Sequence, residues 1–168
     1  MISLLKNISI IILTFAVQFA FLQDLPLTQY GNPYIYLWGL LVMPLNTTRT
    51  IYLLYAFLLG STMDSLESSG GAHTAAMLLM AWFKPSIENV LYGFKDSKSD
   101  EGLIHLPLAK FITQVAILVL LHHTVLFTFE NYGFDHTGLL FLRILISSAT
   151  TILLLGIAHL LFSKRYAE

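Results

Sequence analysis

The chain has 168 residues, of which 56% are hydrophobic and 11% are charged, and its mean hydropathy is +0.72. Soluble domains carry about 25% charged residues, so this composition excludes an ordinary soluble domain and predicts an all-α integral membrane protein. Nine basic against ten acidic residues exclude a nucleic-acid binder that acts through a basic surface. The sequence has no cysteine, which excludes a disulfide scaffold, a thiolate nucleophile and a Cys-based zinc site.

Apolar runs predict six membrane-crossing segments in one domain, residues 1–168, at residues 8–22, 34–45, 50–63, 72–83, 106–129 and 138–162. The first run ends without the small residues that signal-peptide cleavage needs, so we expect a retained helix. The second to fourth runs are shorter than the roughly 20 residues of a straight crossing. We therefore expect irregular, protein-covered segments there. The polar stretch 84–106 is expected to be a solvated cytoplasmic loop.

The distribution of charge sets the predicted orientation. With both termini in the cytoplasm, eight of the nine basic residues fall on the inner side: Lys6, Arg49, Lys84, Lys95, Lys98, Lys110, Lys164 and Arg165. The charged residues of the outer loops are then all acidic: Asp24, Asp64, Glu67, Glu130 and Asp135. The positive-inside rule therefore predicts a multi-pass membrane protein with both termini in the cytoplasm.

Polar residues within apolar helices indicate the faces that meet other helices. Three stripes recur at helical spacing: Asn7, Thr14 and Gln18; Lys110, Thr113, Gln114, Thr124 and Thr128; and Arg143, Ser147, Thr150 and Thr151. We interpret these stripes as packing seams, and a solute pathway is the alternative.

Enzymatic signatures are weak in this sequence. Six histidines occur, at His73, His105, His122, His123, His136 and His159. Only His122 and His123 are close in sequence, and adjacent helical positions point about 100° apart, so no metal site is predicted. No nucleophile elbow, phosphate loop or intrahelical carboxylate pair occurs either. We expect no cofactor and no catalysis, with an intramembrane enzyme as a formal alternative.

The stretch over residues 59–76 and 81–85 contains residues that hydrophobicity alone does not require. Gly60 permits close helix approach, and Gly70 and Gly71 permit a turn with positive φ before a new helix. Trp82 and Lys84 are expected to anchor that helix at the cytoplasmic interface. An ordinary interfacial hairpin is the alternative interpretation.

At these residues the chain resembles the MreD family of bacterial rod shape-determining proteins. The resemblance rests on a Gly-x-x-x-Asp turn, a Gly-x-His-x-Ala-Ala helix start and an aromatic-x-basic-Pro helix end. These motifs are carried by Gly60, Asp64, Gly71, His73, Ala75, Ala76, Trp82, Lys84 and Pro85. Length, the six apolar segments and the expected cytoplasmic termini are similar to that family over the whole chain.

The resemblance implies a non-catalytic subunit of the cell-elongation complex, which maintains cell shape and lateral peptidoglycan synthesis. It implies four partners besides membrane lipids: an MreC-like periplasmic scaffold, an MreB-like actin filament, a RodA-like glycan polymerase and its transpeptidase. The implied fold resembles the substrate-binding component of energy-coupling-factor transporters. A vitamin-like solute-binding subunit is therefore the alternative function, although the short, acidic outer loops favour the scaffold-binding role.

A charge within the membrane needs a partner or a route to water. Asp64 and Arg143 are expected at similar depth near the outer side, so we predict an ion pair between them. Arg143 could also reach the headgroups, and Glu67, Glu130 or Asp135 are alternative partners.

Overall fold

The computed structural model describes residues 12–22, 31–96, 106–131 and 137–163. Helices and turns make up these residues, with no β-strand among them, which confirms the all-α class. Several sequence predictions lie outside the described residues: the first-helix start with Asn7, the loop centre 97–105, the outer-loop residues Asp24 and Asp135, and the histidines His105 and His136.

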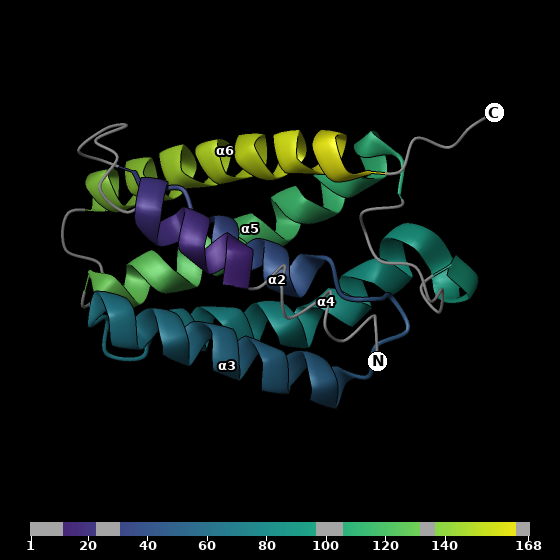
Figure 1. Ribbon diagram of the computed structural model, residues 1–168, viewed down its shortest axis with the longest axis horizontal. Helices are drawn as coiled ribbons and strands as arrows, with labels where there is room; N and C mark the ends of the chain where they lie inside the picture. Colours follow the sequence, from purple (N-terminus) through teal and green to yellow (C-terminus); the bar gives the residue numbers. More distant parts are fainter. Residues whose placement is uncertain (1–11, 23–30, 97–105, 132–136, 164–168) are drawn as a thin grey trace.

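Four long helices form the body of the molecule (Figure 1): α3 (Arg49–Glu67), α4 (Ala72–Asp96), α5 (Leu108–Glu130) and α6 (Thr137–Phe162). Consecutive long helices run antiparallel and pack on one another, α3 on α4, α4 on α5 and α5 on α6. A shorter helix over Ile12–Leu22, which ends in the π-turn η1 (Gln18–Leu22), lies across this body.

The helices α5 and α6 are each long and apolar enough to cross a membrane, with 23 and 26 residues. Both match the predicted segments 106–129 and 138–162 to within two residues. Large apolar side chains stay exposed along α6, among them Leu153, Leu160 and Leu161. Exposed apolar surface of this extent is typical of contact with lipid or with another protein.

The third and fourth segments are longer than predicted. The helix α3 has 19 residues and exposes Leu54, Phe57 and Leu58, so it is not covered by protein all round. The helix α4 continues through Pro85 and is broken only at Gly93, which has φ of 78° and ψ of 165°, so residues 84–92 are helical and the loop predicted from residue 84 is wrong there. The sequence did not predict this continuation because its charged residues indicated a solvated loop. Two of them, Lys84 and Glu88, instead pair inside the protein.

The predicted second segment forms the centre of the molecule. It consists of the 3-10 turn η2 (Ile35–Leu37) and the single α-helical turn α2 (Trp38–Leu41). All four residues of α2 are buried, as are Tyr34 and Tyr36. The expectation of a short, irregular, protein-covered segment is confirmed for this segment, because the long helices enclose its free backbone groups.

Two of the three predicted polar seams are real, in part. Gln18 is buried, and its side-chain amide donates to the carbonyl of Pro33 and accepts from the N–H of Ile35. On α6, Ser147 accepts from the N–H of Asn32 and Thr151 from the N–H of Tyr34. These seams therefore hold the irregular second segment by supplying partners for its backbone.

The stripe predicted on the fifth helix is wrong except at Gln114, which is fully buried. Lys110, Thr113 and Thr124 are exposed, and each threonine hydroxyl donates to a carbonyl of its own helix. A threonine that bonds to its own helix needs no partner helix, so its spacing carries no information about packing.

The helices α3 and α4 approach each other closely at Gly60. A Cβ atom there would lie 2.5 Å from the Cα of Thr74 and 3.0 Å from the carbonyl oxygen of His73. Because both are backbone atoms, they cannot rotate away. The contact of α3 with α4 thus requires glycine at position 60, the first residue of the Gly-x-x-x-Asp motif.

We predict that Gly60→Ala lowers the free energy of unfolding by about 1–3 kcal/mol, because α3 and α4 must separate to admit the methyl group. Gly138→Ala is the matched control, since a Cβ atom at Gly138 meets nothing within 4 Å. Thermal unfolding in detergent measures both. Equal midpoints for the two variants would contradict the close approach.

Candidate functional site

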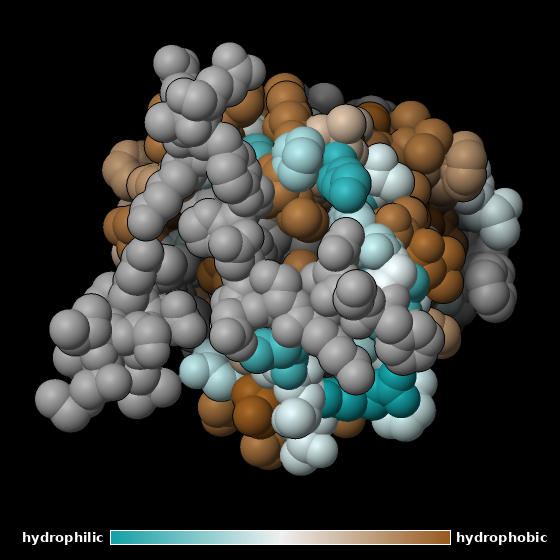
Figure 2. Space-filling view, turned by 90° about the vertical axis from the view of Figure 1, so that its right-hand side faces the viewer, coloured by the Kyte–Doolittle hydropathy of each residue, from teal (hydrophilic) through white to brown (hydrophobic). Residues whose placement is uncertain are grey.

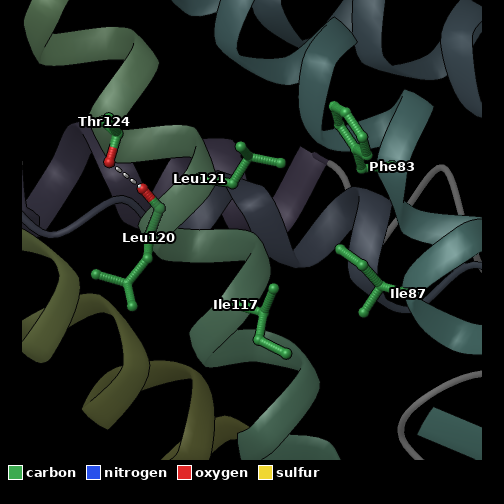
Figure 3. A pocket seen from close by; sticks show the side chains of 6 residues that line it. All are labelled: Phe83, Ile87, Ile117, Leu120, Leu121 and Thr124. Atoms are coloured by element: carbon green, nitrogen blue, oxygen red, sulfur yellow. Dashed lines mark hydrogen bonds between the residues drawn. The ribbon is translucent and has the colours of Figure 1, made fainter. Parts of the chain in front are cut away.

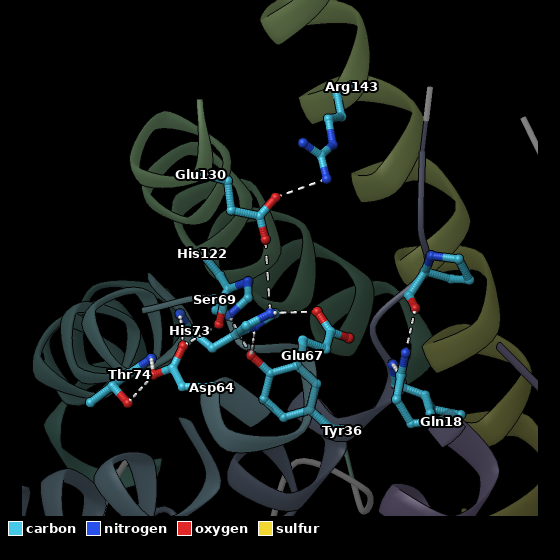
Figure 4. Close-up of polar contacts among 12 residues, drawn as sticks. Gln18, Tyr36, Asp64, Glu67, Ser69, His73, Thr74, His122, Glu130 and Arg143 are labelled. Atoms are coloured by element: carbon cyan, nitrogen blue, oxygen red, sulfur yellow. Dashed lines mark hydrogen bonds and ion pairs between the residues drawn. The ribbon is translucent and has the colours of Figure 1, made fainter. Parts of the chain in front are cut away.

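Asp64 holds the start of α4. Its carboxylate accepts from the backbone N–H groups of His73 and Thr74, both at 2.9 Å, and from the hydroxyls of Ser69 and Thr74 (Figure 4). Gly71 precedes α4 and has no side chain to cap the helix, so a carboxylate from the previous helix satisfies the free N–H groups instead. Negative charge at a helix N-terminus is also favourable electrostatically.

The turn between α3 and α4 is built for this cap. Ser68 ends α3 in the left-handed conformation, with φ of 55°, and Gly70 and Gly71 have φ of 63° and 100°. The prediction of positive φ at the glycine pair is confirmed. The Gly-x-x-x-Asp spacing places Gly60 and Asp64 one helical turn apart, and both contact the first turn of α4.

His73 lies at the centre of a polar cluster that joins α3, α4 and α5 to the turn η2. Its side chain is fully buried, and Nε2 lies 2.9 Å from Oε2 of Glu67 and 3.9 Å from Oε1 of Glu130. The hydroxyl of Tyr36 lies 3.0 Å from His73 Nδ1 and 2.9 Å from His122 Nε2. We call Glu67, His73 and Glu130 the His73 cluster.

The ion pair predicted between Asp64 and Arg143 is wrong. Arg143 Nη2 lies 2.8 Å from Oε2 of Glu130, and the guanidinium also stacks 4.4 Å from the centre of the Phe127 ring. The physical reason is that Asp64 is already saturated by the donors of the α4 start. Glu130 ends α5 one short connection before α6, so it meets Arg143 directly (Figure 4).

Near the opposite end of the long helices lies a second buried charge cluster. Lys84 is fully buried and donates to Oε1 of Glu88 at 2.5 Å and to the hydroxyl of Tyr52 at 2.8 Å. The amide of Gln114 donates to the same carboxylate oxygen at 2.9 Å. Lys84 was expected at the membrane interface. That prediction is wrong because an i,i+4 carboxylate neutralises Lys84 within the core.

Arg49 and Trp82 lie at the same end as Lys84. Trp82 is exposed, and the guanidinium of Arg49 lies 4.6 Å from the centre of its ring. Figure 2 views the molecule from this end and shows hydrophilic residues gathered on it, with hydrophobic residues along the sides. Trp82 thus has the exposed position that its expected anchoring role requires.

A shallow apolar groove lies between α4 and α5 (Figure 3). It has a volume of about 490 Å³ and is lined by Phe83, Ile87, Ile117, Leu120, Leu121 and Thr124. The Thr124 hydroxyl donates to the carbonyl of Leu120, so its hydrogen is already used within α5. The groove therefore favours an apolar occupant.

Several residues of the two clusters were not predicted from the sequence. Tyr36, Tyr52 and His122 lie in apolar runs, and nothing in their spacing marks them as polar partners. The pairing of Lys84 with Glu88 did have a signal, because opposite charges four residues apart face each other on a helix. Glu67 and Glu130 were expected only as outer-loop residues or as alternative partners of Arg143.

Comparison of the chain with known protein families, with curated proteins and with solved structures found no match.

We predict that Asp64→Asn destabilises the protein by about 1–2 kcal/mol, because the amide nitrogen opposes a donor of the α4 start. The stability losses of Asp64→Asn and Arg143→Gln should add in the double variant. The losses of Arg143→Gln and Glu130→Gln should be less than additive when these two changes are combined. Thermal unfolding of the single and double variants measures both couplings. A coupling of Asp64 with Arg143 equal to that of Glu130 with Arg143 would contradict this assignment.

We also predict that Lys84→Met alone costs about 3 kcal/mol, because Glu88 is then a buried charge without its cation. The double variant Lys84→Met, Glu88→Leu should recover most of this loss. The exposed Lys110 provides the control, and Lys110→Met should change the unfolding midpoint little. A double variant less stable than Lys84→Met would show that the pair does not act as a unit.

Proposed function

We propose that this protein is a non-catalytic membrane subunit of the bacterial cell-elongation complex, of the MreD type. In that role it binds an MreC-like periplasmic scaffold and helps to maintain cell shape and lateral peptidoglycan synthesis. The RodA-like polymerase, its transpeptidase and the MreB-like filament join it in the same complex, directly or through the scaffold.

The observation that carries the proposal is the common structural role of the motif residues. Gly60 and Asp64 lock α3 onto the start of α4, and His73 connects that junction to the rest of the bundle. The engagement of both Asp64 carboxylate oxygens in joining α3 to α4 fits a subunit that presents a rigid surface. It fits a transport or catalytic site less well, because such a site leaves polar groups free for a ligand.

The distribution of charged residues supports the proposed orientation. Arg49 lies near one end of the long helices, and Glu67 and Glu130 lie at the other, where Glu130 pairs with Arg143. Under the positive-inside rule the first end faces the cytoplasm, and both termini follow it. The protein then crosses the cytoplasmic membrane six times, with the second segment as an irregular crossing inside the bundle.

The alternative function is a vitamin-like solute-binding subunit of an energy-coupling-factor-type transporter. A solute site needs a cavity with a few convergent polar groups. Among the described residues, the second segment fills the centre of the bundle with Tyr34, Tyr36, Leu37 and Leu40, each no more than 2% exposed. This filled interior favours the scaffold-binding function over the solute-binding one.

The groove between α4 and α5 is the surface that we propose for the single transmembrane helix of the scaffold. Its lining is apolar apart from Thr124, and the lining residue Phe83 and its chain neighbour Trp82 are exposed. An apolar helix packs against such a surface through van der Waals contact, without an unpaired polar group on either side.

The test is co-purification in mild detergent combined with cysteine cross-linking, for which the cysteine-free chain provides a clean background. We expect the scaffold to co-purify, and Ile117→Cys to form a disulfide with cysteines placed along the scaffold helix. Leu153→Cys, on the exposed side of α6, is the matched control and should not cross-link.

Recovery of an ATPase module in place of the scaffold would support the alternative function. Recovery of neither partner would contradict both functions. Co-purification of the scaffold with equal cross-linking at both positions would retain the function but overturn the proposed surface, and an acyl chain would then be the occupant of the groove.

A further inference from the structure

The His73 cluster brings one nitrogen and two carboxylate groups together from three helices. Glu67 ends α3, His73 is in the first turn of α4, and Glu130 ends α5. One ligand atom from each lies within 4.8 Å of the others. We propose that these residues form a binding site for a divalent transition-metal ion of the Zn²⁺ type, which fastens α3, α4 and α5 to one another.

The geometry is close to that of a three-ligand zinc site. Ligands at 2.0–2.2 Å from a tetrahedral ion are about 3.4 Å apart. The two distances from His73 Nε2, 2.9 Å to Glu67 and 3.9 Å to Glu130, lie on either side of that value. The two carboxylate oxygens lie within 4.8 Å of each other, so they must approach by up to about 1.4 Å for all three atoms to surround one ion.

Contacts outside the cluster hold two of the three ligands, His73 and Glu130, in place. The backbone of His73 is fixed by Asp64, and its Nδ1 faces the hydroxyl of Tyr36 at 3.0 Å. Arg143 binds Oε2 of Glu130 and leaves Oε1 to face His73. Metal-binding histidines and carboxylates characteristically have such outer partners, which fix the ring orientation and the free lone pairs.

A proton alone satisfies this cluster less completely than a metal ion does. With hydrogen on Nδ1, His73 donates to Tyr36, Tyr36 donates to His122, and the lone pair of Nε2 faces both carboxylates. With hydrogen on Nε2, the histidine bonds to Glu67, but Oε1 of Glu130 at 3.9 Å stays beyond hydrogen-bond distance. A metal ion can engage all three ligands simultaneously.

The donor set and its exposure indicate the class of ion. A nitrogen ligand favours Zn²⁺ and other late transition metals over Mg²⁺ and Ca²⁺, which prefer oxygen. His73 has no exposed side-chain surface, whereas the side chains of Glu67 and Glu130 are each 17% exposed. The ion therefore enters past the carboxylates, and the fourth coordination position faces that side.

The experiment measures metal binding by the full-length chain in detergent. After loading with Zn²⁺ and removal of free ions, we expect one zinc per chain by mass spectrometry, and Co²⁺ should give the visible absorption of a tetrahedral site. Zn²⁺ at a large excess over its Kd should raise the unfolding midpoint of the chelator-treated protein by about 5 °C or more.

Variants locate the site within the chain. His73→Gln and Glu67→Gln should abolish stoichiometric zinc, and Tyr36→Phe should weaken binding by about tenfold to a hundredfold while leaving all three ligands present. His159→Gln is the control, because His159 is also buried but stacks on Phe111 at the other end of α5. It should retain one zinc per chain.

Two results would overturn the proposal. One is wild-type protein that neither retains zinc nor gains stability from it, which requires no variant to fold. The other is equal zinc retention by wild type and His73→Gln. Neither result bears on the scaffold-binding function, since co-purification of the scaffold is measured separately.

Discussion

The attachment of the Asp64 carboxylate to the first turn of α4 is the constraint on which the junction of α3, α4 and α5 depends. A helix that starts after two glycines has no side-chain cap of its own, and its free N–H groups are costly inside an apolar protein. Asp64 supplies the acceptors from the preceding helix. The contact thereby fixes the turn, the approach at Gly60 and the position of His73 together.

The second constraint is the irregular segment at the centre of the bundle. Turns η2 and α2 leave backbone groups unpaired, and lipid cannot satisfy them. Gln18, Ser147 and Thr151 provide the missing partners from the first and last helices, which are distant in sequence. The interior is thus held by hydrogen bonds to the irregular backbone as well as by apolar packing.

These two constraints bear on function in the same direction. The second segment fills the centre of the bundle with Tyr34, Tyr36, Leu37 and Leu40, and Asp64 is engaged with the start of α4. What the molecule offers to its surroundings is an apolar exterior with a groove between α4 and α5, and a charged cluster at one end. An exposed apolar exterior of this kind is typical of contact with lipid or with another protein.

The sequence by itself determined the helical class, the two full-length helices at residues 108–162, and the turn with positive φ at Gly70 and Gly71. Composition and the length of apolar runs predict the helices, and the conformational freedom of glycine predicts the turn. Each of these features is determined by residues close together in the chain. The tertiary structure alone decided the partners of the charges. Asp64 binds a helix start instead of Arg143, and Lys84 lies in the core with Glu88 instead of at an interface. The partner of a charge depends on which donors and acceptors the fold brings close to it. The linear sequence indicates the depth and spacing of a charged residue but not the competing partners.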